Sequence, residues 1–378
     1  MKQSNKINFK GQNIYIGIDV HLKSWHVTIM TDFGFKRKHS QEASASVLFE
    51  HLKNHYPEGN YYAIYESGFS GFSTYYSLKS YGINCVIAHA ADIPTGQNES
   101  VMKSDTVDSE KLARTLRDKS LKNTIYVPSK DILDHRGIVR YRKHLQDCMS
   151  GCKSRIKHLL YSNGVCMPDC FSNSRTHWTR RFIEWLKNDV KLLSPTKRTL
   201  ERQLEHIENL RLEVLSITRE IRELSRSEYY AEKIRLIQSV PGIGMITAMN
   251  ILVELENIER FNNEKSFASY LGLIPTCRNS GEKIRTGEIT FRGNNRLRIM
   301  LVESSWVAIR RDIALAAMAE SGAVWVPTLS TIGNLRGKGR FSEVAVEKIL
   351  ESAGYEGSQI TKAAPSDASI ALQAELAM

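Results

Sequence analysis

The sequence predicts a mixed α/β domain at the amino-terminal end of the chain and all-α structure in most of the rest. Two observations support this fold class: short strand-like segments alternate with helix-spaced ones early in the chain, and after about residue 130 the long patterned segments have helical spacing. At 378 residues the chain exceeds one ordinary core, so several domains are expected.

The first three predicted strands lie close together in the sequence. Residues 13–20 alternate apolar and small side chains, and residues 25–30 repeat the strand pattern after a short turn. Residues 34–40 are a candidate third strand. Short turns join antiparallel neighbours, so the three segments predict a β-meander.

Two pairs of helix and strand follow, and then a further helix. Apolar residues at helical spacing predict helices over 45–56 and 72–81, and the strand-like segments 61–66 and 84–88 follow them in turn. The last helix begins at Asp105. The resulting order, three strands, helix, strand, helix, strand, helix, is that of a ribonuclease-H-like (resolvase-like) fold.

Four carboxylates fall at the ends of these elements. Asp19 ends the first strand, Glu66 ends the fourth, and Asp105 and Asp108 share one face of a helix that Ser104 can cap. In this topology all four are expected to converge. Oxygen ligands in that number suit Mg²⁺ or Mn²⁺, and two such ions can stabilise the attacking and leaving oxygens of a phosphodiester. Taken singly, each carboxylate also fits a solvated helix start or strand end.

The charge of the chain indicates a polyanionic partner. Lys and Arg number 52 against 41 Asp and Glu, which gives a net charge of +11 and suggests nucleic acid. No segment approaches the ~18 apolar residues of a membrane span, and the amino terminus lacks the apolar core of a secretion signal. We therefore expect a cytoplasmic protein without a membrane partner.

The middle of the chain predicts two long helices. Residues 131–163 have helical spacing and a basic outer face, which is either a solvated surface or a phosphate contact; the candidate contacts are Arg140, Arg155 and Lys157. Between 200 and 224 apolar residues recur at spacings of three and four, which predicts a coiled coil. It could pack against the chain's own basic helix or against another subunit.

Four cysteines in this region form two pairs, Cys148 with Cys152 and Cys166 with Cys170. The first pair lies within a helical pattern, and zinc knuckles usually have a tighter spacing than these pairs show. We therefore favour reduced thiols over a metal site.

The second half contains a helix-hairpin-helix pattern. Residues 234–248 predict a helix, a tight turn at Pro241-Gly242-Ile243-Gly244 and a second helix. Gly242 and Gly244 would let the backbone approach a phosphate beside the free N–H groups of the second helix. The alternative is a corner that only packs two helices.

A basic segment follows, with six basic and two acidic residues between positions 278 and 298. Its candidate phosphate contacts are Arg278, Arg285, Arg292 and Arg296. Ser280 lies among them, where its hydroxyl could attack a phosphorus atom while arginines neutralise the leaving charge. Alone, a serine before a glycine is usually a turn residue.

Several motifs together resemble one known family. They are Gly17-Ile18-Asp19-Val20-His21, Tyr65-Glu66-Ser67, Lys103-Ser104-Asp105 with Asp108, Pro241-Gly242-Ile243-Gly244, and Tyr270-Leu271-Gly272-Leu273-Ile274-Pro275 with Ser280-Gly281. In this order they resemble the DEDD-type transposases of insertion sequences, over roughly residues 12–311. That group includes relatives of the pilin-gene invertases and the bridge-RNA-guided recombinases.

The resemblance implies a transposase or site-specific recombinase that cuts and rejoins DNA at insertion-element ends. By this likeness Asp19, Glu66, Asp105 and Asp108 would hold the divalent ions, and Ser280 would form a covalent serine–DNA intermediate. The acidic cluster and the serine of one site would come from different subunits of a dimer or tetramer. Double-stranded DNA and an element-encoded guide RNA would be the nucleic-acid partners, with the basic helix and coiled coil serving RNA binding and assembly.

We expect four parts: a ribonuclease-H-like DEDD catalytic domain (1–130), a basic helix with a coiled coil (131–230), a transposase domain with the helix-hairpin-helix and the serine (231–313), and a divergent tail (314–378). The tail is rich in alanine where the family usually continues as a basic helix, so it is a divergent ending or a frameshift product. Two other functions fit: a metal-dependent nuclease of the Holliday-junction-resolvase type with water as nucleophile, and a non-catalytic nucleic-acid-binding protein.

Overall fold

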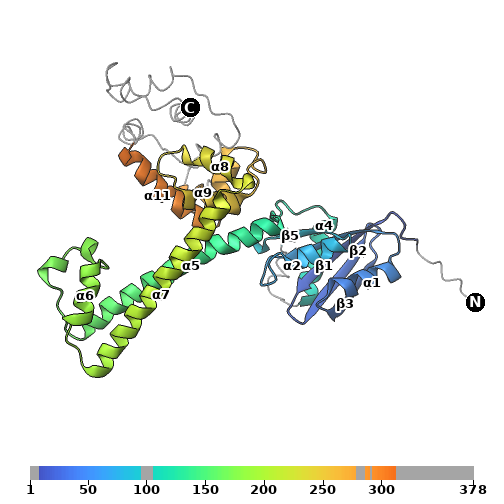
Figure 1. Cartoon of the computed structure of the whole chain (residues 1–378). Coiled ribbons are helices and arrows are strands. Elements are labelled where there is room, and N and C mark those ends of the chain that lie inside the picture. The colour runs from blue at the N-terminus through green and yellow to red at the C-terminus, as the bar shows by residue number, and fades with distance from the viewer. Residues whose placement is uncertain (1–7, 95–104, 278–285, 290–291, 312–378) are drawn as a thin grey trace, which may run out of the picture. The chain divides into compact units, whose positions relative to one another are not determined.

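The computed structural model describes residues 8–94, 105–277, 286–289 and 292–311 (Figure 1). The chain divides into two compact units, Met1–Pro128 and Ser129–Met378. Each unit has its own apolar cores. The predicted division into four parts stays a prediction.

A five-stranded mixed sheet forms the centre of the first unit. Its strands are β1 (Asn13–Val20), β2 (Ser24–Thr31), β3 (Lys36–Glu42), β4 (Asn60–Glu66) and β5 (Asn84–Ala88). The spatial order is β3-β2-β1-β4-β5. The first three strands are antiparallel neighbours, whereas β4 lies parallel to β1 and β5 parallel to β4. This arrangement fits the predicted ribonuclease-H-like fold.

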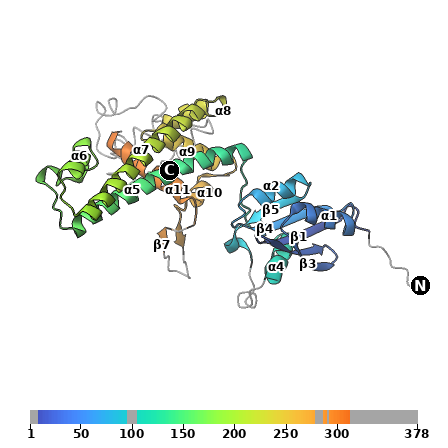
Figure 2. The ribbon, with the colours of Figure 1, turned by 60° about the horizontal axis from the view of Figure 1, so that its bottom comes forward.

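Helices pack on both faces of this sheet. They are α1 (Ala45–His55), α2 (Ser73–Ser80) and α4 (Asp105–Arg117), and the unit also contains the 3₁₀ turn η1 (Ala90–Asp92). Ile16 of β1 shares an apolar core with Leu48 of α1, whereas the next residue, Gly17, faces α4. Because successive residues of a strand point to opposite faces, α1 and α4 cover different sides of the sheet, as Figure 2 shows.

The second unit is mainly helical. Its helices are α5 (Lys130–Ser162), α6 (Arg180–Asn188), α7 (Ser194–Ser225), α8 (Glu228–Gln238), α9 (Met245–Leu255), α10 (Glu264–Leu271) and α11 (Asn295–Arg311), with the 3₁₀ turns η2 (Asp169–Phe171) and η3 (Ser174–Thr176). The short strands β6 (Pro275–Cys277) and β7 (Thr286–Ile289) pair antiparallel. In the part of the chain that the structure describes, no helix is long and apolar enough to cross a membrane.

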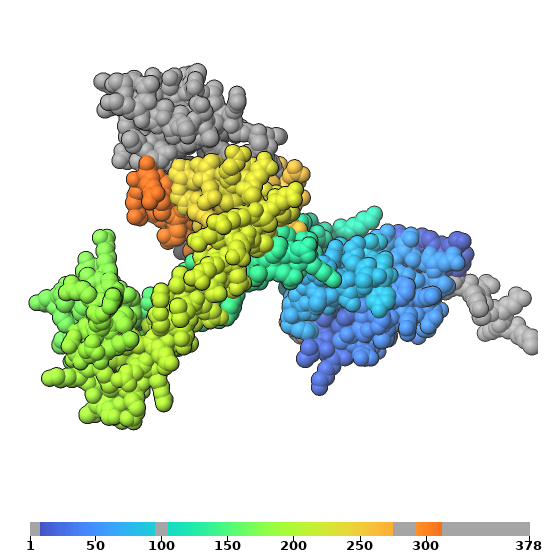
Figure 3. Space-filling model, viewed as in Figure 1, coloured from blue at the N-terminus to red at the C-terminus, as the bar shows by residue number. Residues whose placement is uncertain are grey.

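The long helices α5 and α7 lie side by side, with α6 near one end of the pair and α8, α9 and α11 near the other (Figures 1 and 3). Leu200 and Leu204 of α7 share a core with Ile156 of α5, and Ile221 shares a second core with Val139. The apolar face of α7 is therefore buried against the chain's own basic helix. Whether the pair supercoils stays a prediction.

Candidate metal centre and nucleic-acid contacts

The helix α4 packs directly on β1 at Gly17. A Cβ atom at Gly17 would lie 2.0 Å from the carbonyl oxygen of Ser109 and 2.4 Å from the amide nitrogen of Ala113, so only glycine fits. Asp19 follows Gly17 by two residues on the same strand face, and Asp105 precedes Ser109 by about one helical turn. The close contact therefore brings these two carboxylates to one edge of the sheet.

Asp19, His21 and Asp105 form a compact group of possible metal ligands. Their ligand atoms all lie within 4.8 Å of one another. His21 Nε2 lies 3.1 Å from Asp19 Oδ2 and 3.4 Å from Asp105 Oδ2. Two carboxylates and an imidazole are a donor set that divalent metals accept, so these residues fit a cation.

The electrostatics of Asp19 also fit a cation. Burial raises the pKa of the Asp19 carboxyl, and the negative charges of Asp105 and Asp108 raise it further, against the opposing effect of His21. The pKa of Asp19 therefore lies above its ordinary value. A bound cation would relieve the repulsion among these carboxylates, because it supplies the opposite charge.

The other two predicted ligands, Glu66 and Asp108, lie nearby but outside this group. Glu66 is the exposed last residue of β4, and the pairing of Ile18 with Tyr65 puts it beside Asp19 on the neighbouring strand. The carboxylate of Asp108 lies 3.8 Å from Nζ of Lys111. Of the predicted four, the structure brings Asp19 and Asp105 within ligand distance of a shared histidine.

Sequence reasoning missed the two histidines of this site. His26 Nε2 lies 3.3 Å from Asp105 Oδ2, and its ring meets that of His21 edge to face with centroids 5.9 Å apart. His26 pairs with Asp19 across the β1–β2 hairpin. That hairpin register, together with the two-residue spacing of Asp19 and His21, is the signal that could have found both.

The candidate nucleic-acid contacts on α5 differ in their surroundings. Arg140 donates two hydrogen bonds, of 2.7 and 2.8 Å, to the carboxylate of Glu254, whose side chain is only 3% exposed. Arg155 is exposed and Lys157 is half-buried. Arg140 therefore has an internal partner that sequence reasoning missed, because Glu254 lies 114 residues away.

The two glycines between α8 and α9 also have different surroundings. Gly242 has φ +87°, and a Cβ atom there would lie 2.3 Å from the carbonyl oxygen of Ser304 in α11. Turn geometry and helix packing thus account for Gly242. A Cβ atom at Gly244, which precedes α9, would meet nothing within 4 Å. The open side of Gly244 leaves room for a ligand at the start of α9.

The basic segment around Ser280 is described only in part. Ser280, Arg278 and Arg285 lie outside the described residues, as does the predicted cap Ser104, whereas Arg292 and Arg296 are exposed. The N–H of Asn294 donates a 2.8 Å hydrogen bond to the carbonyl of Tyr270, which joins the residue before α11 to the last turn of α10. Gly293 has φ +112°. A Cβ atom added at Gly293 would lie only 2.6 Å from the amide nitrogen of Gly272.

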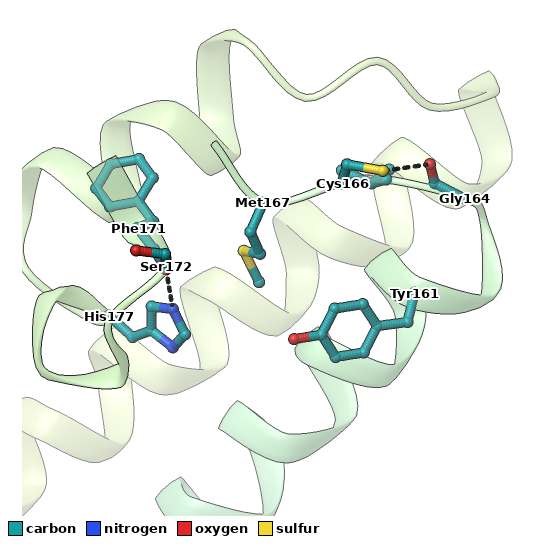
Figure 4. Close-up of a pocket in the computed structure, with 8 residues that line it drawn as sticks. Tyr161, Gly164, Cys166, Met167, Phe171, Ser172 and His177 are labelled. Atoms are coloured by element: carbon teal, nitrogen blue, oxygen red, sulfur yellow. Dashed lines mark hydrogen bonds between the residues drawn. The ribbon is translucent and has the colours of Figure 1, made fainter. Parts of the chain in front are cut away.

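A mostly apolar pocket lies near α6 (Figure 4). It is lined by residues such as Tyr161, Met167, Phe171 and His177, and by none of the predicted catalytic or nucleic-acid-binding residues. The thiol of Cys166 also lines it. Among the described residues, the cysteines join no group of three or more possible metal ligands.

An α/β domain of ribonuclease-H-like order, with carboxylates gathered at the end of β1 and the start of α4, agrees with the class expected from the sequence, that of the DEDD transposases. A family model for IS110-type DEDD transposases, described as "Transposase", matches residues 16–163. A second, described as "Transposase IS116/IS110/IS902 family", matches residues 234–319. The chain belongs to the IS110 family of DEDD transposases, enzymes that cut and rejoin DNA. The DEDD class implies a divalent metal.

Individual relatives agree with this assignment. The Sinorhizobium fredii protein y4qE, named provisionally as a transposase, is 25% identical over 290 residues, which are 77% of this chain and 66% of the relative. The transposase for insertion sequence element IS1533 of Leptospira borgpetersenii is 26% identical over 67% of this chain and 72% of its own length. The transposase for IS1111A of Coxiella burnetii is 23% identical over 55% of each chain.

Proposed function

We propose that this chain is a transposase and site-specific recombinase that cuts and rejoins DNA at the ends of an insertion element. In this proposal Asp19, Glu66, Asp105 and Asp108 hold Mg²⁺ or Mn²⁺, and Ser280 is the nucleophile. The observation that supports it most is the group of Asp19, His21 and Asp105 at the sheet edge, whose ligand atoms lie within 4.8 Å of one another. Membership of the IS110 family supports the rest.

The proposed chemistry is a transfer of a phosphodiester to serine. When bound, the divalent ions would stabilise negative charge on the oxygens of the scissile phosphate. Ser280 Oγ loses its proton and forms a bond to phosphorus, while the bond to the departing sugar oxygen breaks and that oxygen gains a proton. His26, 3.3 Å from Asp105, would orient this carboxylate toward the ions. Arg278 and Arg285 would neutralise charge near the serine.

The proposed partners are duplex DNA, an element-encoded guide RNA and further copies of the chain. The corner between α8 and α9 would act as a helix-hairpin-helix that seats a phosphate at Gly244, where the structure is open. Exposed Arg155, with Lys157, would contact a nucleic-acid backbone. Copies of the chain would assemble into a dimer or tetramer, in which one copy supplies Ser280 to the acidic cluster of another.

A covalent adduct tests the nucleophile. The protein is incubated with its element-end DNA, flanking RNA and Mg²⁺, and the products are separated on a denaturing gel. We expect an SDS-resistant protein–DNA adduct that Ser280→Ala abolishes. Cleavage that survives Ser280→Ala would replace serine attack with attack by water, the mechanism of a resolvase-type nuclease.

Substitution of the acidic cluster tests the metal centre with the same gel. Asp19→Asn should abolish both adduct and cleavage, whereas Asp147→Asn, at an exposed carboxylate of α5, should leave both intact. Full cleavage by Asp19→Asn would remove this residue from the metal centre. If the wild type binds nucleic acid with a steep salt dependence but never cleaves, the chain is a binding protein or a decayed copy.

The guide RNA has its own test. Purified protein is treated with ribonuclease, repurified, and assayed for adduct formation with and without the transcript of the element's flank. We expect adduct formation only after the transcript is restored. Equal adduct yield without any RNA would remove RNA guidance from the proposal and leave the serine mechanism standing.

A further inference from the structure

The pocket near α6 is built from the end of α5 and the connection that leads to α6. Tyr161 lies in the last turn of α5, Met167 between α5 and η2, Phe171 in η2, and His177 between η3 and α6. In Figure 4 Tyr161 and His177 project toward each other from opposite sides of the pocket, and Met167 extends into the space between them. The pocket volume is about 440 Å³, within the range of about 300–1,000 Å³ that small-ligand sites have.

The wall of the pocket at His177 is held in place by the protein itself. Nε2 of His177 donates a 2.8 Å hydrogen bond to the backbone carbonyl of Phe171. The His177 ring stacks on buried Phe182 with centroids 4.9 Å apart, and Phe171 meets Phe182 edge to face at 5.1 Å. The next residue, Trp178, has φ +64°, a strained conformation for a bulky side chain that recurs at ligand sites. A ligand therefore does not have to order this wall when it binds.

The opposite wall is an accessible aromatic ring. Tyr161 is 59% exposed, so a face of its ring is free to stack on a ligand. The hydroxyls of Tyr161 and Ser172 and the thiol of exposed Cys166 add hydrogen-bonding groups to the lining. Aromatic walls with a few polar groups suit a flat heteroaromatic ring better than an aliphatic chain.

Positive charge surrounds this pocket. Residues 153–198 include ten basic and three acidic side chains, which account for most of the chain's net charge of +11. Arg155, Arg175 and Arg181 of this segment are exposed. Lys157 precedes Tyr161 by four positions, so the two side chains share one face of α5. A nucleotide whose phosphate contacts Lys157 can therefore bring its base to Tyr161.

We propose that this pocket binds an unpaired nucleobase of a strand whose phosphates follow the basic residues of segment 153–198. A basic surface with aromatic rings is how proteins bind single strands, because every base has a π face. A base within a duplex is stacked and paired, so the pocket selects unpaired segments, either of RNA or of an opened DNA strand. The inference rests on the proposed function for its class of partner, but it needs neither Ser280 nor the metal centre.

Fluorescence anisotropy with labelled single-stranded oligonucleotides of mixed sequence tests the pocket. The full chain is used in EDTA, so that strands are bound without metal-dependent cleavage. Tyr161→Ala should weaken binding by about five- to a hundredfold, the effect of one lost stacking contact, whereas Tyr161→Phe, which keeps the ring, should stay within about twofold of the wild type. The control is Tyr141→Ala, at another exposed tyrosine of α5 that does not line the pocket. RNA and DNA strands are measured separately, and the larger loss identifies the source of the base.

An abasic DNA strand separates the base from the phosphates. It keeps the charge of the intact strand, so the wild type and Tyr161→Ala should bind it equally and with the same salt dependence. An equal loss on abasic and intact strands would overturn the proposal, because Tyr161 would then act on the backbone or on the fold. The proposal also fails if Tyr161→Ala binds intact RNA and DNA as the wild type does, or if the wild type binds neither.

Two exposed cysteines give a local measurement in the unmutated protein. Cys166 lines the pocket, whereas Cys170, four residues later, does not. A bound single strand should slow the alkylation of Cys166 by iodoacetamide, followed by peptide mass spectrometry, more than that of Cys170. An unchanged rate at Cys166 under saturating strand would place the base elsewhere and overturn the proposal.

The result is independent of catalysis. A wild type that binds strands through Tyr161 but forms no covalent adduct would support this inference and contradict the proposed function. Adduct formation together with unaltered strand binding by Tyr161→Ala would do the reverse.

Discussion

The backbone carbonyl oxygen of Ser109 lies 2.0 Å from the point where a side chain at Gly17 would begin. No L-amino acid other than glycine can occupy that position unless α4 moves away from β1. Because Asp19 and Asp105 are attached to these two elements close to the contact, the separation of the proposed metal ligands depends on it. The glycine therefore acts on the site without touching a ligand.

Gly17→Ala should lower the free energy of unfolding by at least about 1–3 kcal/mol, because the clash is with backbone atoms that cannot rotate away. It should also weaken Mg²⁺ binding. Urea unfolding and calorimetry with Mg²⁺ measure the two effects. Gly137→Ala, in α5, is the control: an added Cβ meets nothing within 4 Å there, and alanine favours the helix. Equal behaviour of the two variants would contradict this account.

Asp19→Asn should make the metal-free protein more stable at neutral pH. The pKa of Asp19 is raised in the folded state, so its ionised form opposes folding. The stabilising contribution of the protonated carboxyl is present below its unfolded pKa and is lost as pH rises through the folded pKa. Melting temperatures in EDTA from pH 4 to 8 should show the variant gaining on the wild type as pH rises. A variant less stable than wild type at pH 7 in EDTA would refute this.

Addition of Mg²⁺ should make the wild type more stable than Asp19→Asn, the reverse of their order in EDTA. The ion binds only the folded wild type with its full set of carboxylates, so it should raise the melting temperature of the wild type more than that of Asp19→Asn. Chelation should restore the original order. An equal Mg²⁺ effect on both proteins would mean that Asp19 is not a ligand.

Glu254→Gln should cost about 3–5 kcal/mol of unfolding free energy, because it leaves the buried guanidinium of Arg136, as well as Arg140, without an anionic partner. The control is Glu184→Gln, whose exposed carboxylate lies 3.1 Å from Arg180 Nε on the surface of α6. That change should cost less than about 1 kcal/mol. Chemical unfolding measures the loss of unfolding free energy in both variants. Similar losses would show that the ion pair of Glu254 stabilises the fold no more than a surface ion pair does.

The same glutamate predicts a pH dependence. Burial raises the pKa of Glu254, but its hydrogen bond to Arg140 and the charges of Arg140 and Arg136 outweigh burial, so the net pKa is lowered. A lowered folded pKa contributes stability above the unfolded pKa of about 4.3, and this is lost as pH falls through the folded pKa. The stability difference between wild type and Glu254→Gln should therefore shrink below about pH 4. A difference that is constant from pH 7 to 3 would contradict it.

Arg140 and Arg155, both predicted nucleic-acid contacts on α5, should behave differently. Arg140→Ala should mainly destabilise the fold, because its guanidinium holds Glu254. Arg155→Ala should leave stability unchanged but weaken nucleic-acid binding and reduce the slope of log affinity against log salt by about 0.7–0.9. Fluorescence anisotropy at several salt concentrations measures both slopes. An unchanged slope for Arg155→Ala would remove it from the interface.

Much of the first unit could be predicted from local patterns. Strands β1 and β4 have the expected bounds to within one residue, because alternation of apolar residues and short turns are properties of neighbouring positions. The strand order then followed from the order of elements. The pattern could not show that Glu254 partners Arg140, nor that Gly242 packs on α11, because both depend on contacts between distant segments.

In the candidate site, too, local patterns predicted some residues, whereas contacts between distant segments determine the others. Asp19 and Asp105 were predicted because strand ends and helix starts fall at known places in this topology. His21 and His26 were missed because histidine has many ordinary roles, and only the register of the β1–β2 hairpin brings His26 to Asp105. The role of Ser280 stays a prediction, since it lies outside the described residues.

The backbone hydrogen bond from Asn294 to Tyr270 has a consequence for how such chains diversify. The polypeptide leaves the helical body after α10 and returns to it at nearly the same point. A loop that departs and re-enters at one place can be exchanged, lengthened or shortened without disturbing the helices that bear it. We therefore expect that exchange of residues 275–292 between relatives would leave the contact between α10 and the start of α11 in place.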